Sequence, residues 1–400
     1  MSALKGIRVI ELASERISWA GKLLGDMGAD VILVEPPQGE PSRNYPPFVD
    51  GEPKENKSLY FWHYNTSKRS VTLDLKKEGD QFLKLIKTAD ILIESEDIDF
   101  LETLGLNYEQ LSEKNNQLIQ ISVTPYGKNN KLSDFPTTDL TLMAAGGPPW
   151  SCGYDDHRLP PVRGWGNQAY HTASHFAVMS ALTALLFRGN TGKGQFIDIS
   201  MTAALNVTTE AASYSWLLNG STVQRQTGRH ASVTPTGETQ MQCADGKWVN
   251  TGVPPRFPEE FQKLLDWIRN SGLEEDFPES VFLEMGASWE GPFDLSQIGI
   301  DDTITAIFGA GREGLQLIAS SNTAYDFFTG CQNLGLAVGI VNTPEEAFDD
   351  AHFKERGFQV NVEHEDIGRT VTYPGAPFIL PKAPWSISRR APHQGEHNQE

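Results

Sequence analysis

Residues 7–12 read IRVIEL, residues 19–27 read WAGKLLGDM and residues 31–35 read VILVE. The first and third runs are rich in valine and isoleucine, as expected of strands that are buried on both faces of a parallel sheet. The run between them predicts a short helix. Strand, helix and strand joined by short loops form a unit in which the two strands lie parallel.

The same alternation continues outward from this unit. Strands are predicted at 70–75, 91–94 and 118–123, with helices near 78–88 and 108–114 between them. A helix rich in alanine and serine is predicted at 172–188, and its small side chains favour close packing against another backbone. Residues 196–200 (FIDIS) are read as another strand or as the start of the next helix. The pattern predicts an α/β protein whose parallel sheet is covered on both faces.

The pattern changes after about residue 225. Residues 238–252 predict a hairpin, with Asp245-Gly246 as a type I′ turn. Helices are predicted at 257–270 and 302–320, and Thr343 opens a capping box. Residues 369–381 are read as strands that return to the first domain, and the polar tail 389–400 is expected on the surface. The predicted division is a large α/β domain at 1–220, a small domain at 225–335, and a return to the large domain at 336–400.

Composition excludes several classes of protein. The formal net charge of −19 argues against a nucleic acid or an anionic membrane as partner. No run of 18 apolar residues exists, and the first residues do not form a signal peptide. The three scattered cysteines fit a reducing compartment, so a cytoplasmic protein is expected. The chain has no GxGxxG after a strand and no CxxC pair, so no dinucleotide is expected. His171 and His175 are four residues apart and could share one helix face, but no carboxylate is obvious near them in the sequence, and packing or capping is preferred over a metal site.

Several segments together resemble the class III (CaiB/BaiF) CoA-transferase family, which includes formyl-CoA transferase and α-methylacyl-CoA racemase. They touch both ends of the chain and the whole first half. The matching segments are 4–12 (LKGIRVIEL), 28–37 (GADVILVEPP), 65–75 (NTSKRSVTLDL), 100–106 (FLETLGL), 188–200 (RGNTGKGQFIDIS) and 391–397 (APHQGEH).

The resemblance implies a Rossmann-like large domain, a smaller α+β domain, and a homodimer of two interlocked chains. It implies an acyl-CoA and a carboxylic acid as substrates, with no tightly bound cofactor. Lys68, Arg69 and Lys76 form a basic group suited to the CoA phosphates. The resemblance adds Arg43 and Leu73 to the CoA contacts. One departure is the acidic run 94–99, which stands where the family has an aromatic and basic patch and would repel phosphates.

The family's nucleophile is an aspartate just before the small-residue helix. The aligned residue here is Tyr170, and no Asp or Glu lies between Arg163 and Ala173. A phenol is almost wholly protonated at neutral pH, so it does not replace a carboxylate as nucleophile. Asp155 or Asp156 is an alternative acid.

Three functions therefore stay open. The first is CoA transfer with an altered centre. The second is proton chemistry on a CoA ester (isomerisation, hydration or elimination) by Tyr170 and His171 at a helix N-terminus. The third is a non-catalytic member that binds an acyl-CoA or serves as a partner subunit. Racemisation by the family's route is disfavoured, because it also requires a histidine where this chain has Thr138.

Overall fold

The computed structural model describes residues 2–97, 99–252, 254–291 and 293–400, which divide into two compact units. Unit 1 comprises 1–151, 161–222 and 348–400, and unit 2 comprises 152–160 and 223–347. No helix in the described part of the chain has the length and apolar character needed to cross a lipid bilayer.

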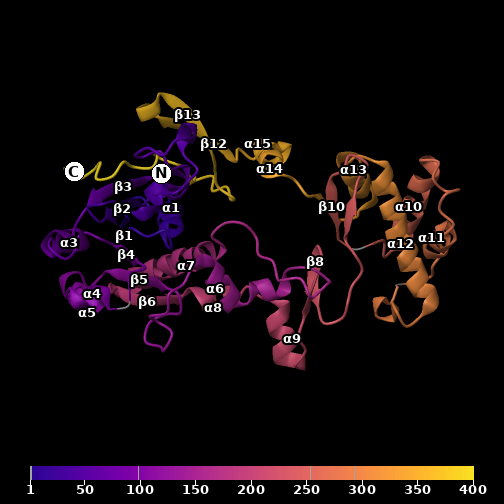
Figure 1. Cartoon of the computed structure of the whole chain (residues 1–400), viewed down its shortest axis with the longest axis horizontal. Coiled ribbons are helices and arrows are strands. Elements are labelled where there is room, and N and C mark those ends of the chain that lie inside the picture. The colour runs from indigo at the N-terminus through magenta and orange to yellow at the C-terminus, as the bar shows by residue number, and fades with distance from the viewer. Residues whose placement is uncertain (1, 98, 253, 292) are drawn as a thin grey trace. The chain divides into compact units, whose positions relative to one another are not determined.

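Six parallel strands form the main sheet of unit 1 within the described residues, in the order β3-β2-β1-β4-β5-β6 (Figure 1). The chain builds outward from β1 to β2 and β3, then crosses back to β4 and continues in the other direction. The reversal between β1 and β4 is the position at which open α/β sheets bind ligands, at the carboxyl ends of the strands. The strands are β1 (Arg8–Leu12), β2 (Asp30–Glu35), β3 (Lys68–Thr72), β4 (Ile91–Glu94), β5 (Ile119–Thr124) and β6 (Gln195–Ser200).

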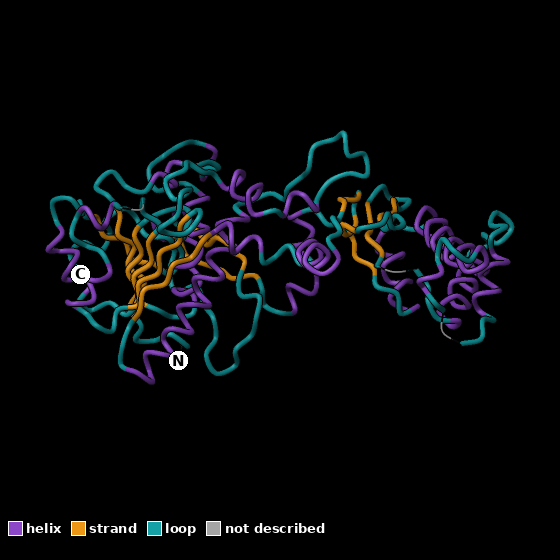
Figure 2. The backbone as a smooth tube through the Cα atoms, turned by 90° about the horizontal axis from the view of Figure 1, so that it is seen from below, coloured by secondary structure: helices purple, strands orange, loops and turns teal. Residues whose placement is uncertain are grey.

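Apolar side chains alternate between the two faces of this sheet. Val9 and Val31 belong to one buried cluster, and Ile10 and Ile32 belong to another. Figure 2 shows the strands as adjoining orange ribbons with helices and loops around them. The predicted parallel α/β sheet is therefore confirmed. The helices of unit 1 are α1 (Ser18–Asp26), α2 (Leu59–Tyr64), α3 (Gly79–Ile86), α4 (Phe100–Thr103), α5 (Tyr108–Lys114), α6 (Asp139–Gly146), α7 (Gln168–Thr191), α8 (Met201–Asn206), α9 (Ala211–Asn219) and α15 (Ala351–Glu355).

Close packing explains the small residues in α1 and α7. A Cβ at Gly21 of α1 would lie 1.6 Å from the Glu11 carboxylate, so only glycine fits there. Ala173, Ala177 and Ala181 recur every fourth residue along α7 and have no exposed surface. The residues at 196–200 form the edge strand β6, which settles the choice that the sequence left open.

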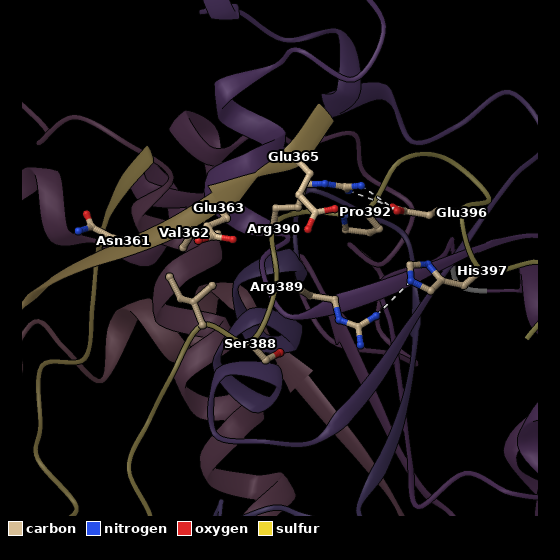
Figure 3. A pocket seen from close by; sticks show the side chains of 11 residues that line it. Asn361, Val362, Glu363, Glu365, Ser388, Arg389, Arg390, Pro392, Glu396 and His397 are labelled. Atoms are coloured by element: carbon tan, nitrogen blue, oxygen red, sulfur yellow. Dashed lines mark hydrogen bonds and ion pairs between the residues drawn. The ribbon is translucent and has the colours of Figure 1, made fainter. Parts of the chain in front are cut away.

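Most residues of the C-terminal segment 389–400 lie at the surface, as expected, but Ala391 and His397 are buried and the segment is bonded to the sheet. His397 donates its backbone N–H to Ser70 of β3, and Asn398 accepts from the backbone N–H of Thr72 at 2.8 Å. The segment therefore covers the free edge of the sheet, where a chain would otherwise offer unpaired N–H and C=O groups. Figure 3 shows Arg389 directed at His397 and Arg390 paired with Glu396 on the wall of a neighbouring cavity. Unit 1 also contains the antiparallel pair β12 (Gln359–His364) and β13 (Arg369–Pro374).

Unit 2 combines a small antiparallel sheet with a helical layer around its own core, which includes Val249, Phe261 and Phe327. The helix α14 (Pro344–Asp349), which starts at the end of this unit, begins with the predicted Thr343 capping box. The other elements are β7 (Gln224–Gln226), β8 (Arg229–Ser232), β9 (Gln240–Gln242), β10 (Trp248–Thr251), β11 (Val338–Ile340), α10 (Pro258–Asn270), α11 (Ser280–Ala287), α12 (Asp302–Ser321) and α13 (Ala324–Leu334).

The hairpin between β9 and β10 is confirmed, but its turn differs from the prediction. Gly246 has a φ of 82°, whereas Asp245 is not among the residues with positive φ. A type I′ turn requires positive φ at both central residues, so the assignment was wrong. Instead, Gly246 donates to the Cys243 carbonyl at 2.9 Å, and Cys243 donates to Lys247 at 2.8 Å. The loop is thus longer than two residues and needs only one left-handed position.

Candidate active site

Tyr170 is fixed by the way α7 begins. The carboxylate of Asp139 accepts a hydrogen bond from the Ala169 backbone N–H at 2.8 Å, and it pairs with Arg163 at 3.1 Å. The side-chain amide of Asn167 binds the Tyr60 hydroxyl. Tyr170 is therefore held in the first turn of the helix and is only 5% exposed. Asp139 serves here as an anchor for α7.

His171, the second candidate, lies in an aromatic cluster built by three helices. Its Nε2 lies 2.9 Å from the Tyr64 hydroxyl, and its ring centre lies 5.0 Å from that of Trp19. The Trp19 indole donates to His175 at 3.1 Å. Burial lowers the pKa of His171 to about 4, with a further contribution from His175. The imidazole is therefore uncharged at neutral pH.

Burial also raises the pKa of the Tyr170 phenol, and the nearby carboxylate of Glu15 raises it further. A hydrogen bond with the Arg16 side chain acts in the opposite direction but does not reverse the shift. The phenol is consequently protonated at neutral pH. Tyr170 and His171 together offer proton donors and acceptors, but neither provides the negatively charged oxygen that attacks a thioester.

Sequence analysis missed two charged residues of this site, Glu15 and Arg16. They lie in the loop between β1 and α1, directly at the reversal of the strand order. Arg16 lowers the pKa of the Tyr170 phenol, whereas Glu15 raises it. Burial raises the pKa of Glu15, while Arg16 lowers it. The available signal was the polar run at the end of the first strand, since loops at that edge commonly carry binding residues.

Two cavities open along the carboxyl edge of the sheet and share one residue, Glu96. The larger has a volume of about 700 Å³ and lies at the ends of β1, β2 and β3, where Leu73 and Lys76 line it. The smaller has a volume of about 440 Å³ and is lined by Arg16, Thr124 and other residues of the loops after β4 and β5. Burial raises the pKa of Glu96 to about 7, assisted by Glu94 and Asp97 and opposed by Arg16. A carboxyl group that is partly protonated at neutral pH therefore stands between the cavities.

The five candidate CoA contacts fall into two groups. Leu73 and Lys76 line the 700 Å³ cavity.

The other three candidates, Arg43, Lys68 and Arg69, do not line this cavity, and each of them is engaged in an ion pair. Arg43 makes two 2.7 Å contacts with Glu35 behind the cavity wall. Arg69 pairs with Asp30 at 2.7 Å, toward the opposite end of its strand.

Lys68 is fully buried beneath α1. Its ammonium contacts Glu11 at 2.8 Å, the Ser18 carbonyl at 2.9 Å and Asn65 at 2.9 Å. Burial lowers the pKa of Lys68 and raises that of Glu11 to about 7, while their mutual attraction opposes both shifts. In this structure the positive charge of Lys68 is used inside the fold and does not face solvent.

The other candidate acids and the acidic run also have partners. Asp155 pairs with Arg229 at 2.7 Å, which holds the pKa of Asp155 at about 2, and Asp156 pairs with Arg158 at 2.8 Å. Within the acidic run, Glu94 is buried and pairs with Lys128 at 3.2 Å. The run is thus less uniformly negative than its sequence suggests.

Comparison with known proteins identifies the family to which the chain belongs. The family model for CoA-transferase family III matches residues 4–398, and the chain belongs to this family. It is 31% identical to the succinyl-CoA:(R)-benzylsuccinate CoA-transferase subunit BbsE of Thauera aromatica, over 98% of this chain and 92% of that protein. It is 30% identical to a succinate–glutarate CoA-transferase of Agrobacterium fabrum, over 98% and 93%.

Solved structures support the fold. A CaiB/BaiF family protein from Brucella suis superposes with a TM-score of 0.78, covering 99% of this chain and 97% of its own, at 24% sequence identity. The Brucella protein therefore has the same architecture.

Proposed function

We propose that this chain is a subunit of a CoA-transferase that moves CoA between a succinyl-type thioester and a carboxylic acid. The observation that carries the proposal is the family match over nearly the whole chain, together with relatives named for succinyl-CoA and succinate. The ester would lie along the carboxyl edge of the sheet. Its nucleotide end would contact Leu73 and Lys76, with the Arg43–Glu35 ion pair next to that wall.

At the position of the family's nucleophile, this chain lacks the charged group that such a transfer needs. A carboxylate oxygen attacks the thioester carbonyl carbon, the C–S bond breaks, CoA leaves as the thiolate, and the acyl group remains as a mixed anhydride with the carboxylate. At the aligned position Tyr170 is protonated and buried, and His171 is neutral. We therefore propose that a second, non-identical family III chain supplies the attacking carboxylate. The relative BbsE is itself named as a subunit, which supports this reading.

The assembly is part of the proposal. In the interlocked homodimer that the resemblance implies, both active centres would contain Tyr170. In a pair of two non-identical chains, one of the two centres would contain a carboxylate. The free thiols Cys152, Cys243 and Cys331 support a reducing, cytoplasmic setting for either assembly. Proton chemistry by Tyr170 and His171 is the second candidate, because both groups are neutral and lie beside the first turn of α7.

An exchange assay separates these functions. The chain would be purified alone, and also co-expressed with a family III chain from the same organism that carries aspartate at the position aligned with Tyr170. Each preparation would be given succinyl-CoA and a series of carboxylic acids, and the CoA esters would be separated by chromatography. The proposal predicts exchange only in the co-expressed preparation. Exchange at a similar rate by the chain alone would reject it, and isomerised or hydrated esters would favour the second candidate.

A further inference from the structure

Arg16 is a half-buried cation whose charge is not used by the fold. It lies in the loop that follows β1, near enough to the Tyr170 phenol to lower the pKa of that group. Among the described residues it forms no ion pair within 4.0 Å. Glu15 and Glu96 act on it only at longer range. This setting differs from that of Arg43 and Lys68, whose charges are neutralised by direct carboxylate contacts.

Two residues that line the 440 Å³ cavity beside Arg16 have hydroxyl groups without hydrogen-bond partners. Thr124 is 2% exposed, and its Oγ1 makes no hydrogen bond within the described structure. The Oγ1 of Thr137 is also buried and unpaired there, and both residues line the cavity. Leaving a buried hydroxyl unpaired costs about 1–3 kcal/mol, so native proteins rarely retain such groups unless they serve another purpose. The cavity is thus lined by an arginine without an ion-pair partner and by two threonines whose hydroxyls are unpaired.

Three acidic side chains line the same cavity. Asp97 and Asp134 are exposed, so solvent and salt screen their charges. Glu96 is partly protonated at neutral pH and can then donate a hydrogen bond. The buried part of the wall is therefore suited to an anionic oxygen, for which a guanidinium fork and hydroxyl donors have the right geometry.

We propose that Arg16, together with Thr124 and Thr137, binds the distal carboxylate of a dicarboxylic acyl group, so that this cavity selects dicarboxylic over monocarboxylic substrates. The inference rests on the proposed function, since it assumes that an acyl-CoA enters the site. The distal carboxylate, which does not react, would accept from Arg16, while the thioester lies toward Glu96 and the larger cavity. Arg16 would then determine specificity without taking part in bond making.

Calorimetric titration with two CoA esters tests the proposal. Succinyl-CoA and butyryl-CoA have acyl chains of equal length and differ in the distal carboxylate. The variant Arg16→Gln should bind succinyl-CoA about 10- to 100-fold more weakly, which corresponds to the loss of a hydrogen bond to a charged group. Its affinity for butyryl-CoA should change less than about twofold. Thr124→Val, which preserves shape, should weaken succinyl-CoA alone by about three- to tenfold.

A control variant and two measurements of folding accompany the titration. Arg356→Gln removes an exposed arginine of the same unit and should leave both affinities unchanged. Circular dichroism and thermal denaturation would show that the variants are folded. Unchanged binding of succinyl-CoA by Arg16→Gln, or an equal loss for both esters, would overturn the specificity role while leaving the proposed function intact. If neither ester bound the wild-type protein or its assembly, the proposed function would fail, and this inference with it.

Discussion

At position 170 the chain carries a buried phenol, and the side chains around it keep it neutral. Burial is the main reason that the pKa of Tyr170 is raised, and Glu15 adds to the effect. His171 is neutral for a related reason, because an imidazolium would lose hydration in the aromatic cluster. These two residues differ from a carboxylate in charge at neutral pH, and that difference decides whether the site can attack a thioester by itself.

The depressed pKa of His171 predicts a pH dependence of stability. Its value of about 4 is below the ordinary 6.5, so between these pH values the unfolded chain binds more protons than the folded one. The free energy of unfolding should therefore fall as the pH is lowered from 6.5 to 4. Urea denaturation of His171→Gln should show a shallower fall, by about 2 kcal/mol over this range after allowance for partial exposure. The same substitution at exposed His230 should leave the slope unchanged, and an equally steep fall in His171→Gln would contradict the assignment.

Arg16 and Glu15 are residues of the site that could not be identified from the sequence alone. Tyr170 could be located by counting back from the helix that ends near Arg188, because that helix has no interruption. Arg16 is more than 150 positions away in the sequence, and it reaches Tyr170 only because β1 is central in the sheet and α7 packs beside it. The contact depends on strand order, which the sequence pattern did not establish.

At the scale of single elements, the apolar strands were the most predictable part of the molecule. Fully buried strands such as β1 and β4 have apolar side chains on both faces and no competing helical pattern. The hairpin turn and the C-terminal segment were less predictable. The turn depends on the sign of one backbone angle at Asp245, and the segment gains order only by pairing with β3, about 325 positions earlier.

The contact between Lys68 of β3 and Glu11 of β1 explains why a charged residue occurs within the core. Each residue is fully buried, and each charge is tolerated because the other lies 2.8 Å away. Lys68→Met would leave the Glu11 carboxyl buried without its cation, so we expect unfolding to become easier by about 3 kcal/mol. Equilibrium denaturation in urea would measure the change.

A double variant provides the control for this pair. In Lys68→Met with Glu11→Leu both charges are absent, so part of the lost stability should return, with a coupling energy of at least about 1 kcal/mol. Arg69→Gln, which removes a neighbouring and more exposed cation, should cost less than Lys68→Met. Strictly additive losses at positions 11 and 68 would show that the ion pair does not stabilise the sheet.

At the scale of the whole molecule, unit 1 leaves large apolar side chains in solvent. Leu217 and Leu218 of α9 are 78% and 79% exposed, and Leu186 of α7 is 75% exposed. Adjoining exposed apolar side chains such as Leu217 and Leu218 mark a region that another chain covers. The feature is consistent with the proposed assembly of two chains.

Charges placed on this surface should therefore weaken association. We expect the double variant Leu217→Asp with Leu218→Asp to run as a single chain in size-exclusion chromatography with light scattering, because two carboxylates would be desolvated at the contact. Asn219→Asp adds charge to a polar position of the same helix and should not have this effect. An unchanged mass for the leucine variant would place the contact elsewhere on the molecule.

Acyl trapping measures directly which of the two chains carries the attacking carboxylate. The co-expressed assembly would be incubated with succinyl-CoA and hydroxylamine, which converts an acylated Asp or Glu to a hydroxamate, and each chain would be mapped by peptide mass spectrometry. The account predicts a hydroxamate on the second chain and none on this one. A hydroxamate on this chain, at Glu15, Glu96 or any other acidic residue, would contradict it.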